Sequence, residues 1–215
     1  MQRQAAFAIV CASALACLTV AVARGSIAQQ APPPETVLPA PPVETVGKAA
    51  TPWMRTQLKR LRGPLRPASH PRSLVVARLR LALSQGSGHV WFVTYRSRAG
   101  RLCGVTFESR PFASAWATGG LPCLGGQCGA ICTSGTTADP DAGWLAYSAT
   151  APKSADGFRL TMTDGSRFRF PLTGPLVTGA EDRRVVIVQV SSRAAVSLAE
   201  ALQGEQVVAS QSYTP

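Results

Sequence analysis

Asparagine is absent from this chain of 215 residues. Its absence excludes an N-linked glycosylation site, an Asn-Gly hairpin turn, and a catalytic base oriented by an asparagine amide. Histidine is scarce as well: only His70 and His89 occur, and neither belongs to a recognisable catalytic motif such as G-x-S-x-G. No phosphate-holding glycine-rich loop precedes a helical pattern. We therefore expect neither enzyme activity nor a cofactor.

Acidic residues are also few, with 11 against 22 lysines and arginines, which gives a net charge of +11. The excess is uneven along the chain: residues 1–28 carry +2, residues 29–73 carry +5, and residues 74–215 carry +4. A nucleic-acid partner would favour a concentrated basic surface on the folded part. The mild charge of residues 74–215 argues against such a partner, and the hydrophobic fraction of 46% is sufficient for a packed core.

The N-terminus carries an uncharged run, residues 5–23, between Arg3 and Arg24. A basic start, an apolar stretch and the small-x-small sequence Ser26-Ile27-Ala28 predict a secretory signal peptide over residues 1–28. The run is also long enough to span a bilayer, so an uncleaved membrane anchor is the alternative. Both interpretations predict an extracytoplasmic protein, either secreted or anchored to the outer face of the membrane.

Residues 29–73 combine many prolines with the densest positive charge of the chain. Proline fixes φ and removes a donor, so this pattern predicts a disordered, solvated linker. Within it, residues 52–62 predict a short amphipathic helix, whose apolar side consists of Trp53, Met54, Leu58 and Leu61. Either this side packs on the folded domain, or the basic side binds an anionic surface.

From residue 74 onward the hydrophobic period is two, which is typical of strands. Residues 74–215 predict an all-β domain, an antiparallel β-sandwich or open barrel of about eight or nine strands, after an N-terminal hydrophobic helix and a disordered linker. The tail is ambiguous, because residues 194–202 fit either a helix or a strand that turns at Gly204 and pairs with residues 207–209.

One hairpin has a register that the sequence specifies. A three-residue loop of residues 163–165, with Gly165 in the left-handed conformation, pairs Leu160 with Phe168 and Phe158 with Phe170. A two-residue loop would instead place arginines on the apolar face. The three-residue loop is therefore the prediction.

The same register places Arg159 opposite Arg169, with Arg167 nearby. Like charges directly opposite are unfavourable unless an anion lies between them. The anion could be a ligand or acidic partner, or a carboxylate of the chain such as Glu108; otherwise the arginines extend into water. A second pair of arginines, Arg78 and Arg80, lies on another predicted strand, residues 74–83. The candidate anion-binding residues are Arg78, Arg80, Arg159, Arg167 and Arg169, and the partners considered are an anionic envelope polymer, a lipid surface and an acidic protein.

Four cysteines remain if residues 1–28 are removed: Cys103, Cys123, Cys128 and Cys132. An even number in an oxidising compartment predicts two disulfides, with three possible pairings. A metal site of four thiolates is the alternative, and we do not expect one. Most of these cysteines lie in residues 109–143, a predicted loop without a strand pattern, in which Trp116 is a candidate exposed contact residue.

Several of these segments occur together in a known arrangement. The chain contains, in order, an N-terminal hydrophobic segment, a Pro-rich linker, the strand Arg101-Leu-Cys-Gly-Val, a cysteine loop, the hairpin LTMTDGSRFRFPL, a following Gly-Pro and RRVVIVQV. In this arrangement it resembles uncharacterised exported β-sandwich proteins of high-GC bacteria. The resemblance covers residues 90–210 and implies an extracytoplasmic β-sandwich with strands over residues 194–209. It implies no activity and no functional residues.

The sequence thus predicts an exported, non-catalytic module of the bacterial cell envelope with a binding or structural role. Two alternatives remain open. One is a hydrolase with an unrecognised site in residues 109–143. The other is a membrane-anchored extracytoplasmic sensor or signalling partner, which would keep residues 5–23 in the membrane.

Overall fold

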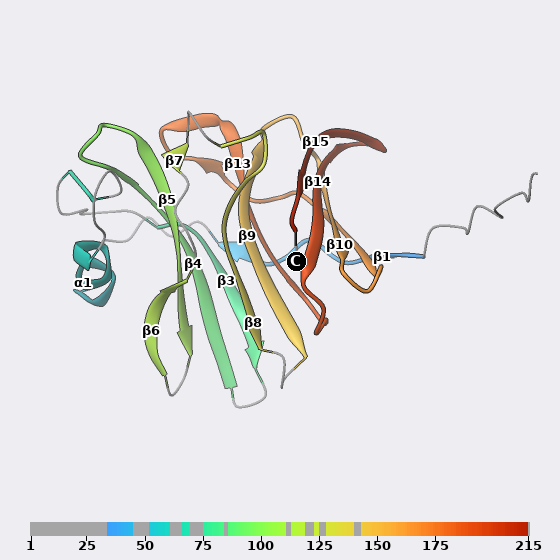
Figure 1. The fold of residues 1–215 in the computed structure, drawn as a ribbon, viewed down its shortest axis with the longest axis horizontal. Coiled ribbons are helices and arrows are strands. Elements are labelled where there is room, and N and C mark those ends of the chain that lie inside the picture. The colour runs from blue at the N-terminus through green and yellow to red at the C-terminus, as the bar shows by residue number, and fades with distance from the viewer. Residues whose placement is uncertain are drawn as a thin grey trace, which may run out of the picture. The chain divides into compact units, whose positions relative to one another are not determined.

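The computed structural model describes residues 34–44, 52–60, 66–68, 75–83, 86–110, 113–118, 123–124, 128–139 and 143–214. Within them the chain forms fifteen strands and one helix, so the expected all-β class is confirmed (Figure 1). The strands make several antiparallel sheets, and in the described residues no sheet closes on itself. The predicted signal segment lies outside these residues. No helix among those described has both the length and the apolar character needed to cross a bilayer.

The strands form three sheets, each named here by a central strand. The β4 sheet contains β2 (Val43–Glu44), β3 (Val75–Leu83), β4 (Gly86–Arg96), β5 (Leu102–Arg110) and β6 (Ala113–Thr118), with β7 (Cys123–Leu124) paired to β5. The β9 sheet contains β12 (Leu176–Val177), β13 (Ala180–Val190), β9 (Trp144–Pro152) and β8 (Cys132–Asp139). The β10 sheet contains β1 (Glu35–Val37), β11 (Arg167–Pro171), β10 (Gly157–Met162), β14 (Val196–Gln203) and β15 (Gln206–Ser212).

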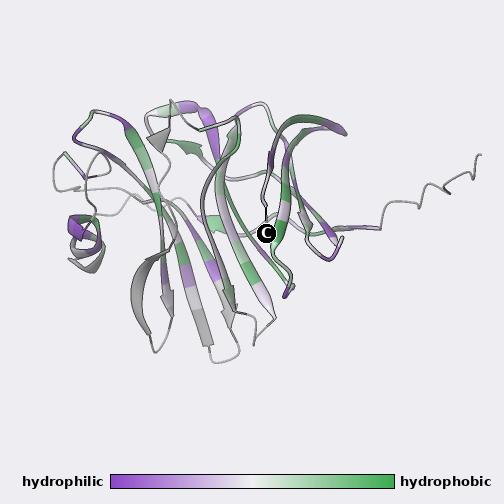
Figure 2. Ribbon diagram, viewed as in Figure 1, coloured by the Kyte–Doolittle hydropathy of each residue, from purple (hydrophilic) through white to green (hydrophobic). Residues whose placement is uncertain are grey.

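Strand β13 shows why the β9 sheet lies between two cores. Because successive side chains of a strand point to opposite faces, Val186 and Val188 join one apolar cluster with residues of the β10 sheet, whereas Val185 and Ile187 join another with residues of the β4 sheet. All four are buried. The apolar residues of β13 follow its charged first part, Glu181 to Arg184, and Figure 2 colours apolar residues green. A strand that is apolar on both faces is therefore explained by packing on both sides.

The prediction that residues 109–143 lack strands is wrong for their described part. Strands β6 and β8 and the short β7 form there, and β8 pairs antiparallel with β9 along its whole length. Its sequence, CTSGTTAD, has few large apolar residues, so it lacks a clear hydrophobic alternation. Threonine nevertheless favours extended backbone, and the neighbouring β9 supplies the hydrogen bonds. Such short or polar strands account for most of the difference between the fifteen strands observed in the described residues and the eight or nine predicted.

The Pro-rich segment is also ordered where it is described. Residues 34–44, which we call the strap, contain β1, which pairs in parallel with β11, and β2, which pairs with β3. This differs from the solvated linker that the prolines predict. Proline-rich backbone is already extended, and prolines are tolerated beside an edge strand. The exposed edge of β11 gives such a segment hydrogen-bond partners.

Helix α1 (Pro52–Arg60) packs on the β4 sheet. Met54 and Leu58 are buried and belong to an apolar cluster with Val93 and Val105 of that sheet. Lys59 is exposed. Of the two alternatives for this segment, packing of the apolar side on the domain is the one that the described residues show. Trp53 and Leu61 lie outside the described side chains.

The 157–171 hairpin and the tail follow the predicted strand pattern. Leu160 pairs with Phe168 and Phe158 with Phe170, and Gly165 has φ +85°, as the three-residue loop requires. The tail forms β14 and β15, which turn at Gly204 with φ +58°. The strand alternative for residues 194–209 is confirmed.

Candidate functional site

The predicted arginine cluster forms on the β10–β11 hairpin, and an acidic residue lies within it. Arg159 lies opposite Arg169 in the ladder. Glu35 of β1 approaches three guanidinium groups: its Oε1 lies 3.5 Å from Arg159 Nη1 and 3.9 Å from Arg167 Nη2, and its Oε2 lies 3.8 Å from Arg169 Nη1. The strap therefore supplies an anion that the strand register calls for.

Two further carboxylates complete the charge balance. Arg159 Nε donates to Glu200 Oε2 at 2.7 Å, and Arg169 Nη1 donates to Glu205 Oε1 at 2.6 Å. The hydrogen bond to Glu200 is the main reason that the pKa of Arg159 lies above its ordinary value. Three arginines thus face three glutamates. Glu108, the carboxylate that the sequence suggested, lies buried on β5 in another sheet.

Arg78 and Arg80 do not join this cluster, because they lie on β3 of the β4 sheet. Arg78 forms an ion pair with Glu44 of β2, and its guanidinium carbon lies 5.1 Å from the ring centroid of Trp91. Arg80 lies opposite His89 in the ladder. Burial, followed by the charges of Arg78 and Arg80, lowers the pKa of His89.

The strap thereby brings one glutamate to each predicted arginine group. Glu35 meets the group on the β10 sheet and Glu44 meets Arg78 on the β4 sheet. These are the two acidic residues of the segment 29–73. The strap also borders an open cavity of about 440 Å³, between its residues Val37, Leu38 and Pro39 and the hairpin residues Phe170 and Pro171. The strap is therefore a structural element of the domain.

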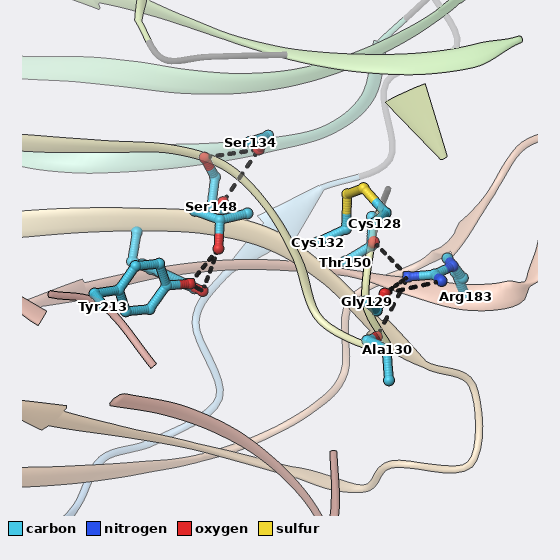
Figure 3. The surroundings of a disulfide bond; sticks show 11 residues. Cys128, Gly129, Ala130, Cys132, Ser134, Ser148, Thr150, Arg183 and Tyr213 are labelled. Atoms are coloured by element: carbon cyan, nitrogen blue, oxygen red, sulfur yellow. Dashed lines mark hydrogen bonds between the residues drawn. A yellow bond between two sulfur atoms is a disulfide. The ribbon is translucent and has the colours of Figure 1, made fainter. Parts of the chain in front are cut away.

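A disulfide joins Cys128 and Cys132 at the start of β8 (Figure 3). Cys103 is also disulfide-bonded, and the β5–β7 ladder places Cys123 directly opposite it. The sequence left three pairings open, and the Cys128–Cys132 bond selects one of them. A bonded Cys128 and Cys132 have no thiolates to offer a metal.

Arg183 of β13 holds the disulfide loop from outside. Its Nη1 donates to the backbone oxygens of Gly129 at 3.2 Å and Ala130 at 3.3 Å, and to Thr150 Oγ1 at 3.4 Å (Figure 3). A cation bonded to two carbonyls fixes the loop conformation in addition to the covalent closure. The loop is therefore held by a covalent bond and by an arginine from a different strand.

A ring of three hydroxyl groups lies beside this loop. Tyr147 and Tyr213 place their hydroxyl oxygens 2.6 Å apart, Thr133 Oγ1 lies 2.9 Å from the hydroxyl of Tyr147, and it also bonds to Tyr213. Burial is the main cause that raises the pKa of Tyr147, so its phenol stays protonated to a higher pH than an exposed tyrosine does. The three side chains come from β8, β9 and the residue after β15.

Next to the ring is a pocket of about 200 Å³. Its lining contains no charged residue and consists of Cys128, Gly129, Ile131, Cys132, Thr133, Gln211 and Tyr213. Sequence reasoning identified the cysteines of this region but missed Thr133, Gln211 and Tyr213. Thr133 lies far in sequence from Gln211 and Tyr213, and none of the three belongs to a motif, so no local signal could have identified them.

The buried tyrosines make stability sensitive to alkali. Burial raises the pKa of Tyr95 to about 12, above the ordinary value of about 10. A raised folded-state pKa favours the neutral form, so this contribution is complete below pH 10 and is lost as pH rises toward 12. We expect urea denaturation to show falling stability over this range. The Tyr95→Phe variant should show a shallower decline, and an equal decline in both proteins would contradict this assignment.

Ser134, in the predicted loop, makes buried hydrogen bonds with Thr106 and with Ser148 of β9. Ser134 Oγ lies 2.9 Å from Thr106 Oγ1 and 3.0 Å from Ser148 Oγ, and Ser148 Oγ also donates to the backbone oxygen of Gly135. All three hydroxyl residues are buried, between strands of the β4 and β9 sheets. Trp116, the candidate contact residue, lies on β6 opposite Glu108, and its side chain lies outside the described part.

Comparison of the chain with protein-family models, with curated proteins and with solved structures finds no match.

Proposed function

We propose that this protein is an exported, non-catalytic β-sandwich module of the bacterial cell envelope, with a role in binding or structure. The disulfide between Cys128 and Cys132 carries the proposal. Disulfides form and persist in oxidising compartments, which in bacteria lie outside the cytoplasm. The hydrophobic segment before the domain, residues 5–23, has the pattern of an export signal.

The packing of the domain supports a structural or binding role. The β9 sheet has apolar clusters on both faces, which is consistent with a sandwich of stacked sheets. The strap contributes a strand to each of the other two sheets and ion-pairs with both. The strap therefore links two of the three sheets.

Fewer guanidinium groups are available to an anionic partner than the number of arginines suggests. Arg159 and Arg169 already bond to Glu200 and Glu205 and lie close to Glu35. An envelope polymer, lipid surface or acidic protein would therefore compete with all three glutamates for this cluster. Binding of such a partner would favour release of the strap, because the two anions share the same guanidinium groups.

The proposal is tested by locating the full chain in a bacterial host and mapping its thiols. We expect it in the extracytoplasmic fraction, with the Cys128 and Cys132 peptides recovered as one disulfide-linked species after alkylation. N-terminal sequencing then distinguishes cleavage after Ala28 from a retained anchor. Recovery in the cytoplasm with alkylated thiols would contradict export. A variant whose residues 5–23 are deleted is the control and should remain inside the cell.

A further inference from the structure

We propose that the pocket beside the Cys128–Cys132 loop binds one sugar ring of a neutral saccharide. This inference rests on the proposed exported binding role and names a ligand class for it. It is carried by the hydrogen-bonding character, the charge and the size of the pocket.

The hydrogen-bonding character follows from the ring of three hydroxyls. Thr133, Tyr147 and Tyr213 have one proton each, and three mutual contacts use all three protons when each group donates to the next. Each oxygen then keeps a lone pair for another donor. Thr133 and Tyr213 line the pocket, so what the ring offers to a ligand is acceptor capacity.

Gln211 adds a further acceptor. Its Nε2 donates to the backbone oxygen of Ser212 at 3.1 Å, which uses part of its donor capacity within the chain. Its Oε1 faces the disulfide loop, 3.8 Å from the position that a Cβ at Gly129 would occupy. A pocket rich in acceptors selects a ligand that brings several donors.

The charge of the pocket excludes ionic ligands of both signs. The lining holds neither a carboxylate for a cation nor a cationic group for an anion. The guanidinium of Arg183 lies behind the loop and donates to the carbonyls of Gly129 and Ala130, which disfavours a second cation nearby. An anion would meet the lone pairs of the hydroxyl ring. A neutral molecule with several hydroxyl donors, as in a saccharide, matches both requirements.

The size of the pocket limits the ligand to one ring. Its volume of about 200 Å³ lies below the roughly 300–1,000 Å³ of sites that hold drug-sized ligands. The disulfide and Arg183 fix the loop that forms its wall, so little ordering is needed on binding. The pocket is open, and the remainder of a longer glycan could extend into solvent.

The test uses saturation-transfer NMR on the exported protein purified from its host. The probes are glucose, mannose, galactose, rhamnose and N-acetylglucosamine, with methylammonium and acetate as charged comparison molecules. We expect at least one sugar to bind, at millimolar affinity or tighter, and neither ion to bind. If no sugar binds, or if an ion binds in this pocket as well as the best sugar, the inference is wrong.

A matched pair of variants locates the binding. In Gly129→Leu the new side chain extends toward Gln211 with ordinary contacts and no positive φ to strain it, so it should fill the pocket and weaken binding about ten-fold or more. In Ala130→Leu the change falls on an exposed neighbour outside the lining, and affinity should stay within about two-fold. Equal affinities of the two variants would place the sugar elsewhere and overturn the assignment.

A third variant and the export assay separate the possible failures. Tyr213→Phe removes one hydroxyl of the ring and should weaken binding about three- to ten-fold, while thermal unfolding reports whether the domain remains folded. An exported, disulfide-bonded protein that binds no sugar overturns this inference and leaves the proposed function standing. A cytoplasmic protein that binds sugar in this pocket overturns the proposed function and leaves the assignment of the pocket standing.

Discussion

Replacing Glu35 with lysine is expected to lower the free energy of unfolding by about 2 kcal/mol. The lysine would bring a fourth cation among Arg159, Arg167 and Arg169, and it would remove the carboxylate that all three approach. The Glu35 side chain is 21% exposed, so solvent screens part of the repulsion. Urea denaturation measures the loss, and limited proteolysis should show faster cleavage within residues 34–44.

The matched control is Glu205→Lys. Glu205 pairs with Arg169, one of the same arginines, but its side chain is 83% exposed, so its reversal should cost less than about 1 kcal/mol. Adding Arg167→Glu to Glu35→Lys should restore part of the lost stability by reversing the pair. Equal losses for the two single variants would show that the strap is not held by this cluster.

Replacing Gly174 with alanine is expected to cost about 3 kcal/mol or more. Gly174 lies where the chain passes from β11 in one sheet to β12 in another, and a Cβ there would fall 2.0 Å from the backbone oxygen of Val185. The contact is with backbone, so no side-chain movement relieves it. Neighbouring bonds fix the crossing, since Arg184 Nη1 donates to the Gly174 oxygen and the Val185 N–H donates to Pro175.

Gly129→Ala is the control for this substitution. The nearest atom to its new Cβ would be the backbone oxygen of Ile131 at 3.6 Å, which is an ordinary contact, so stability should change by less than about 0.5 kcal/mol. Thermal and urea unfolding of both variants measure the difference. A Gly174→Ala protein as stable as the control would mean that the β11–β12 crossing does not approach β13 so closely.

The 157–171 hairpin was predictable because its determinants are local. Asp164 and Gly165 fix the loop, and the alternation of Phe168 and Phe170 with arginines fixes the face. A one-residue shift would have exposed the whole apolar set, so the sequence allows one sensible register. The pairing of Arg159 with Arg169, and their need for an anion, followed directly.

The source of that anion was not predictable by the same reasoning. Glu35 and Arg159 are 124 residues apart in the sequence, and a Pro-rich segment with few apolar residues gives no strand signal. Glu108 was the wrong carboxylate because the sequence does not show which strands share a sheet. For the same reason, the sequence could not show that Arg78 and Arg80 lie in a different sheet from the other arginines.

The sequence predicted only one part of the candidate binding pocket, its cysteine loop. Cysteine number predicts disulfides, and their position near residues 128–132 marks the wall of the pocket. The acceptor groups come from β8, β9, β15 and the residue after β15. Their convergence depends on tertiary packing, which periodicity does not encode.

The strap also determines where the β10 sheet stops growing. Without β1, the strand β11, Arg-Phe-Arg-Phe-Pro, would present an unpaired row of amides and carbonyls, onto which a strand of another molecule could add. In its place stands a strand of three residues, Glu35–Val37, with Pro34 before it and Pro39 shortly after it. Prolines have no N–H to donate to a further strand. The Pro-rich composition that suggested a spacer therefore makes this edge a poor template for a strand of another molecule.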